Sequence, residues 1–227
     1  IPDGCEVVDA GGLYAGPGLV DIHTHAGLRN WFYENPVAAS EAVLMHGVTD
    51  VLPTLYFDMS KAGYLDAIKL IKDSIASGKC PNISGLYMEG PYLNPKFGCD
   101  KDKNQWKGDI KKEDYIDIVE AVKDLARVWS VAPEREGILE FVKDVKERIP
   151  SIAFTVAHSE ATPPQIEELI PYGMKIGTHH TNATGTLENY PECRGVCVDE
   201  MVNYNSSMYA EIISDSLGIH VDPYMQR

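Results

Sequence analysis

Short apolar runs alternate with amphipathic stretches along almost the whole 227-residue chain, and this alternation restricts the folds open to it. The apolar runs predict strands over residues 18–22, 48–52, 83–88, 128–132, 152–157, 175–178 and 209–213. The stretches between them place apolar residues at helical spacing and predict helices over 37–46, 60–77, 113–127, 137–148 and 164–170. Repeated strand–helix units imply parallel strands joined by right-handed crossovers. Seven such strands without a break favour a TIM-type α/β barrel over an open doubly wound sheet, with the last of its eight strand–helix units absent.

Charge balance and cysteine content restrict the setting in which the protein works. Lys and Arg number 20 against 34 Asp and Glu, and the resulting net charge of −14 repels nucleic-acid phosphates and anionic membranes. We therefore expect neither a nucleic-acid nor a membrane partner, and no apolar run approaches the ~18 residues that a transmembrane helix needs. The first residues do not read as a signal peptide, and five scattered cysteines are typical of free thiols in a reducing cytoplasm.

Polar residues follow the predicted strands near their C-terminal ends, the face on which α/β barrels carry their active sites. These residues are His23, His25, Glu89, Glu134, His158, His179, His180 and His220. One histidine alone is more often a surface or core residue than a ligand, but a coincidence at several strand ends favours one shared site. Because His179 and His180 are adjacent and should point apart, we expect only one of them to face that site.

His23 and His25 stand on either side of Thr24, just after the first predicted strand. In extended backbone, residues i and i+2 point the same way, so both imidazoles should face one point. Neutral imidazole is a good ligand for zinc, iron and nickel. The alternative is a surface His-x-His pair, which the apolar residues 18–22 disfavour because they are typical of a strand buried on both faces.

Glu89 follows an apolar strand, where a charged side chain is costly unless it is paired or bound to a metal. A carboxylate in that position can bridge two cations, and the alternative is a helix N-cap or a loop salt bridge. Cys193 and Cys197 also have ligand chemistry, but no second cysteine pair completes a structural zinc site with them.

Taken together, these motifs resemble the amidohydrolase superfamily. Residues 16–25 are similar to its opening signature, which ends in His-Thr-His. Within it, the motifs resemble those of the N-acetylglucosamine-6-phosphate deacetylases, in the same order along the chain. They are residues 86–95 with Glu-Gly-Pro, 132–134, 157–159, 178–183 with Thr-His-x-x-Asn-Ala, and 218–221.

The resemblance implies a ligand set for one or two divalent metal ions. Glu89, His158 and His179 match the ligands of the main catalytic metal. His23 and His25 match members that hold a second ion, with Glu89 as the bridge. Zinc is the metal that we expect, with iron, manganese and nickel as alternatives.

The resemblance also implies a substrate site and a domain plan. Asn182, Ala183 and His220 match positions that bind the sugar phosphate, and Arg194 matches an arginine that reaches the phosphate of a neighbouring subunit in a homodimer. The general acid/base aspartate is expected beyond Arg227, so the catalytic residue stays unknown. Residues 1–15 are expected to be a remnant of a small β-domain, and 16–227 the metal-dependent barrel.

The function that these features predict is hydrolysis of a linear amide. The expected substrate is a phosphorylated amino sugar, N-acetylglucosamine-6-phosphate, cleaved to glucosamine-6-phosphate and acetate by water that a metal activates. Two alternatives stay open. One is another amidohydrolase reaction, of the cyclic-amide or deaminase type, and the other is a barrel that binds metal without catalysis.

Overall fold

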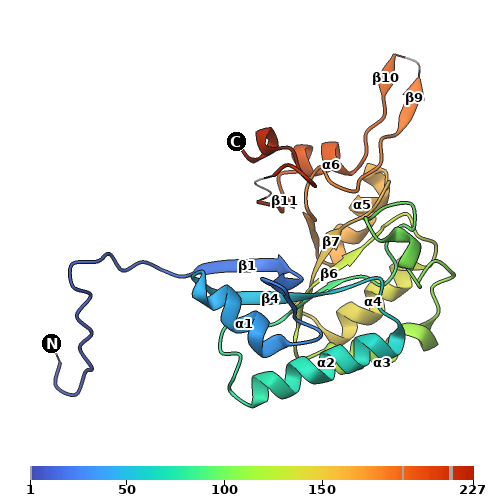
Figure 1. Cartoon of the computed structure of the whole chain (residues 1–227). Helices are drawn as coiled ribbons and strands as arrows, with labels where there is room; N and C mark the ends of the chain where they lie inside the picture. The colour runs from blue at the N-terminus through green and yellow to red at the C-terminus, as the bar shows by residue number, and fades with distance from the viewer. Residues whose placement is uncertain (1, 191, 215–216) are drawn as a thin grey trace.

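The computed structural model describes residues 2–190, 192–214 and 217–227, apart from the side chains of 188–190 and 194. Its central element is a curled sheet of seven strands, in which every neighbouring pair is parallel (Figure 1). In spatial order the strands are β1 (Leu19–Thr24), β4 (Val48–Tyr56), β5 (Leu86–Glu89), β6 (Ala126–Val131), β7 (Ala153–Val156), β8 (Met174–Gly177) and β11 (Tyr209–Ala210). The seven parallel strands confirm the predicted α/β class, and β1 and β11 are the two edges of the sheet.

Helices connect the strands and cover one face of the sheet, with α1 to α4 side by side along it in Figure 1. They are α1 (Pro36–Met45), α2 (Lys61–Ala76), α3 (Lys112–Val122), α4 (Ile138–Arg148), α5 (Pro163–Leu169) and α6 (Val198–Tyr204). Short 3-10 helices occupy Lys101–Lys103, Ile170–Tyr172 and Pro223–Gln226. No helix among the described residues is long and apolar enough to cross a bilayer.

Local capping fixes several of the predicted helix starts. Asn35 accepts a hydrogen bond from the backbone N–H of Ala38, with Pro36 at the first helical position of α1. Thr162 and Gln165 form a capping box at the start of α5.

Several predicted boundaries differ from the observed ones, and three of them are wrong for identifiable reasons. Helix α3 ends at Val122, not at residue 127, because the carbonyl of Leu125 already accepts a sheet hydrogen bond from Leu86. Strand β4 runs past Pro53, since that proline lies at an irregularity in the β1–β4 register. Strand β11 comprises only Tyr209–Ala210, shorter than the predicted 209–213.

Some elements were not predicted at all. Two short antiparallel hairpins join β2 (Ala26–Gly27) to β3 (Asn30–Trp31) and β9 (Glu188–Tyr190) to β10 (Cys193–Arg194). Helix α6 was not predicted either. Residues 2–18 carry neither helix nor strand and extend away from the sheet in Figure 1, so the assignment of 1–15 to a β-domain stays a prediction.

The main core lies between the sheet and its helices, where large aromatic side chains pack edge to face. Trp129 of β6 contacts Phe141 of α4 at a ring-centroid distance of 5.5 Å, and Phe141 contacts Tyr92 and Tyr115 at 5.3 and 4.8 Å. All four rings are almost completely buried. Burial of this much aromatic surface stabilises the packing of the helices on the sheet.

A substitution at Gly177, the last residue of β8, tests the packing of α6 on the sheet. A Cβ atom there would lie 2.5 Å from a methyl carbon of Val202, so Gly177→Ala should lower the free energy of unfolding by about 1–3 kcal/mol through overpacking. Gly108→Ala is the control, because a Cβ at Gly108 meets no atom within 4 Å, and its effect should stay within about 0.5 kcal/mol. Urea denaturation followed by circular dichroism measures both. Equal stability of the two variants would contradict the packing of α6 described here.

Candidate metal centre

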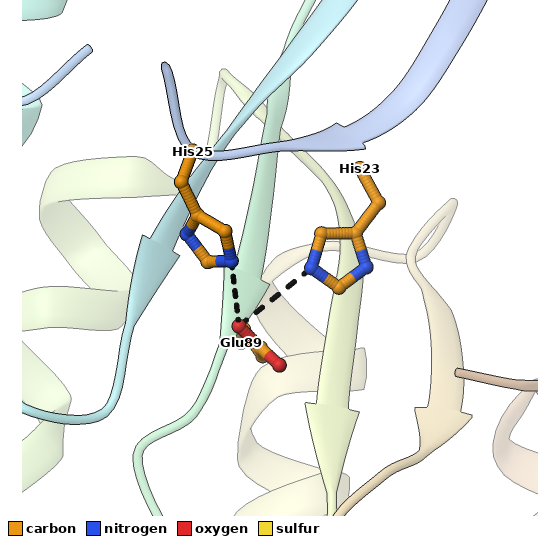
Figure 2. Close-up of side chains that lie close together, drawn as sticks. All are labelled: His23, His25 and Glu89. Carbon is orange, nitrogen blue, oxygen red and sulfur yellow. Dashed lines mark ion pairs between the residues drawn. The ribbon is translucent and has the colours of Figure 1, made fainter. Parts of the chain in front are cut away.

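Five of the predicted ligands converge at the C-terminal ends of the strands. His23 and His25 come from the end of β1, and Glu89 is the last residue of β5. His158 and His179 each follow by two residues the strands β7 and β8. Figure 2 shows the first three: both imidazoles leave the end of β1 on the same side and point at the carboxylate, as the i, i+2 spacing predicts.

Each oxygen of the Glu89 carboxylate faces a different pair of histidines. Oε2 lies 3.6 Å from His23 Nε2 and 3.3 Å from His25 Nε2. Oε1 lies 2.8 Å from His158 Nε2 and 3.3 Å from His179 Nε2, and these two nitrogens are 3.1 Å apart. One carboxylate is therefore shared by two groups of imidazole nitrogens.

Burial and charge act together on these groups. Glu89 is 2% exposed. Burial alone would raise the pKa of its carboxyl, but hydrogen bonds with the surrounding histidines hold this pKa well below its usual range, so the group is ionised. Burial also disfavours a charged His23, yet the hydrogen bond with Glu211 and the nearby charge of Glu89 raise the pKa of His23 to about 10. At His158 burial prevails over the attraction of Glu89 and lowers the pKa.

The donor set fits a divalent cation at either group. His23, His25 and Glu89 form one group of ligand atoms and Glu89, His158 and His179 the other, with all atoms of a group within 4.8 Å of one another. Glu89 Oε2 is buried and has no hydrogen-bond partner among the described residues. Tetrahedral zinc with bonds of about 2.05 Å would place two imidazole nitrogens about 3.3 Å apart, close to the 3.1 Å between His158 and His179.

The loops that carry His158 and His179 have unusual backbone conformations. Both histidines have positive φ, at 44° and 31°, a region that non-glycine residues rarely occupy. Glu134 holds the first loop, accepting hydrogen bonds from the Ser159 hydroxyl at 2.7 Å and the Glu160 backbone N–H at 2.8 Å. Glu134 was recognised in the sequence as a polar residue at a strand end, and it contacts the loop beside His158 rather than the cluster around Glu89.

His180 turns away from this cluster, as expected for one of two adjacent histidines. Its Nε2 lies 3.1 Å from Asn203 Oδ1 on α6. His179 instead donates from Nδ1 to the carbonyl oxygen of Asn182 at 3.1 Å, which leaves its Nε2 directed at Glu89. A hydrogen bond from the second ring nitrogen is typical of a histidine that binds a metal.

Two of the predicted substrate residues lie together. The Asn182 side chain donates to the carbonyl oxygen of His220 at 2.8 Å, and the His220 ring lies 3.8 Å from the sulfur of Cys99. Ala183 follows with a positive φ of 54°. The side chain of Arg194 lies outside the described residues. Neither group of ligand atoms found among the described residues includes a cysteine.

Glu211 and Tyr87 contact the cluster and were not predicted. Glu211 directly follows β11, and its Oε1 accepts a hydrogen bond from His23 Nδ1 at 2.6 Å. The sequence places it inside the predicted strand 209–213 instead of at a strand end, which explains the omission. Tyr87 lies within β5, where its ring reads as part of the apolar core.

Comparison with known proteins gives a clear structural likeness and no sequence match. No protein-family model matches the chain, and no curated protein shows significant similarity to it. Among solved structures, the N-acetylglucosamine-6-phosphate deacetylase of Pasteurella multocida superposes with a TM-score of 0.77 at 24% identity, over 98% of this chain and 56% of that one.

The corresponding deacetylase of Mycobacterium smegmatis superposes at 0.74 with 25% identity, over 92% of this chain and 57% of that one. An aspartate-to-alanine mutant of the M. smegmatis enzyme, in complex with N-acetyl-D-glucosamine-6-phosphate, superposes at 0.73 with 24% identity, over 92% and 53%. The resemblance predicted from the motifs is thus confirmed for the fold, and the chain spans little more than half the length of the structures it matches.

Adjacent histidines offer a matched pair of variants for the cluster. His179→Ala should lower the content of bound divalent metal, because it removes one of the three ligand atoms that Glu89, His158 and His179 supply. His180→Ala should retain the metal content of the wild type, since His180 faces α6. Elemental analysis of folded protein after dialysis against zinc measures both. Equal loss of metal in the two variants would contradict the assignment.

Proposed function

We propose that this chain is part of a metal-dependent deacetylase that hydrolyses the N-acetyl amide of N-acetylglucosamine-6-phosphate to glucosamine-6-phosphate and acetate. The observation that carries the proposal is the Glu89 carboxylate, buried between two pairs of imidazoles at the C-terminal ends of parallel strands. It supports the proposal because this arrangement occurs in a fold that the chain shares with deacetylases of that sugar phosphate.

The chain's own residues would bind the metal ions and exclude bulk water at this site. Glu89, His158 and His179 would hold the main ion, and His23 and His25, with Glu89, a second one. When bound, a divalent cation such as zinc lowers the pKa of water and polarises a carbonyl oxygen, which is the chemistry that amide hydrolysis needs. The burial of Glu89 and the two histidines around Oε1 keeps bulk water away from this point.

The phosphate would lie at the rim of the same strand ends. Thr181 and Ala183, on either side of Asn182, have positive φ at 68° and 54°, a backbone pattern in which successive N–H groups can converge on an anion. His220 is exposed and held beside Asn182 by its carbonyl oxygen. Backbone N–H groups that converge in this way would attract a small anion at close range, despite the net charge of −14.

The proposal includes five further points, four carried by the resemblance and one by the cysteine content. The strands belong to a TIM-type barrel, and zinc is the preferred metal. Two copies form a homodimer in which Arg194 reaches the phosphate bound by its neighbour. The protein works in the cytoplasm, in keeping with its five cysteines scattered along the chain. A general acid/base aspartate is needed in addition to the residues assigned here.

Phosphate recognition can be tested by binding. Metal-loaded protein should bind N-acetylglucosamine-6-phosphate at least about tenfold more tightly than N-acetylglucosamine, because charge-assisted hydrogen bonds to the phosphate are formed with one sugar alone. Titration calorimetry measures both affinities, and release of acetate from each sugar is followed in parallel.

His220 can be tested by substitution, with His46, another exposed histidine, as the control. His220→Ala should reduce the preference for the phosphorylated sugar, whereas His46→Ala, at the end of α1, should leave it unchanged. Equal affinity of the wild type for both sugars would reject the phosphate site.

A further inference from the structure

The Glu211 carboxylate is held in place by the sheet. Its backbone N–H donates to the carbonyl oxygen of Gly177 at 2.9 Å, and its own carbonyl oxygen accepts from the His180 N–H at 2.7 Å. These bonds continue the β8–β11 pairing beyond Ala210. The side chain of Glu211 is 8% exposed, so it points into the molecule and cannot adjust freely.

Three donors converge on this one carboxylate. Oε1 accepts from His23 Nδ1 at 2.6 Å and from the backbone N–H of His179 at 3.2 Å. Oε2 accepts from the Tyr87 hydroxyl at 3.2 Å. Glu211 thus contacts one histidine from each of the two ligand groups around Glu89.

The geometry places Glu211 behind the ring of His23. The imidazole presents Nδ1 to Glu211 and Nε2 to Glu89, and these two ring nitrogens point in different directions. A cation beside His23 Nε2 is therefore on the opposite side of the ring from Glu211. Because a carboxylate can only accept, His23 must carry a proton on Nδ1, and Nε2 is the nitrogen left to bind the ion.

Tyr87 makes this arrangement rigid. Its ring stacks on His23 at a centroid distance of 4.3 Å and an angle of 27°. Its hydroxyl lies 2.8 Å from the hydroxyl of Thr178, which in turn donates to Thr155 at 2.6 Å. These hydroxyls are buried, and their hydrogen bonds fix the ring against which His23 rests.

We propose that Glu211 is a positioning residue for the second cation: it fixes the tautomer and orientation of His23 so that Nε2 faces Glu89. The contact also joins the two edge strands of the sheet, because His23 lies on β1 and Glu211 directly follows β11. The order of the strands thus brings the first and last of them to the same site. Loss of such a hydrogen bond behind a ligand typically weakens metal binding by about 10–100-fold.

The inference rests on the proposed function only in requiring bound cations. Metal-free protein is titrated with zinc against a chromophoric chelator, which reports the number and the affinity of the ions without any activity. The wild type should bind two equivalents. Glu211→Ala should weaken one of them about 10–100-fold and leave the other within about threefold of the wild type. Glu211→Gln retains an acceptor for His23 Nδ1 and should recover part of the lost affinity.

Asp144→Ala is the control for a purely structural effect. Asp144 accepts hydrogen bonds from Tyr115 and Lys112 on the helical face, so its loss should lower the melting temperature while leaving both zinc affinities unchanged. The inference is overturned if the wild type binds fewer than two ions, or if Glu211→Ala retains both affinities. It is also overturned if Asp144→Ala weakens the same ion to the same extent. A protein that binds two ions but no phosphorylated sugar would refute the proposed substrate and leave the role of Glu211 standing.

Discussion

One buried carboxylate organises this structure. Glu89 is ionised at the end of a strand with hardly any exposed surface, a state that is costly without compensating positive charge. His23 and His25 lie close to one oxygen of this carboxylate, and His158 and His179 lie within hydrogen-bond distance of the other. The strand ends must converge for these contacts to form, so the fold and the site depend on each other.

The convergence of these five residues can be predicted from the sequence because each of them follows a short apolar run. His23 and His25 are read from the two-residue period of a strand, and Glu89 is read from a charge after an apolar run. Strand order needs no more than the repeated alternation of strands and helices. These features depend on residues that are neighbours in the chain, so they can be recognised without any knowledge of tertiary contacts.

What could not be predicted depends on contacts between distant residues. Glu211 reaches His23 across 188 positions, and its place at a strand end is hidden because β11 has only two residues. Helix α6 packs against Gly177, and its short length gives little helical periodicity. The end of α3 is set by the sheet hydrogen bond that Leu125 accepts, although the helical pattern continues past it.

The position of bound cations tests the central role of Glu89 most directly. Crystals of zinc-loaded protein would give anomalous difference density at the zinc absorption edge. We expect one peak between Glu89, His158 and His179 and a second between Glu89, His23 and His25, so that the carboxylate contacts both ions. Density at other residues, or ions that leave the Glu89 carboxylate uncoordinated, would contradict the assignment of this cluster as the metal centre.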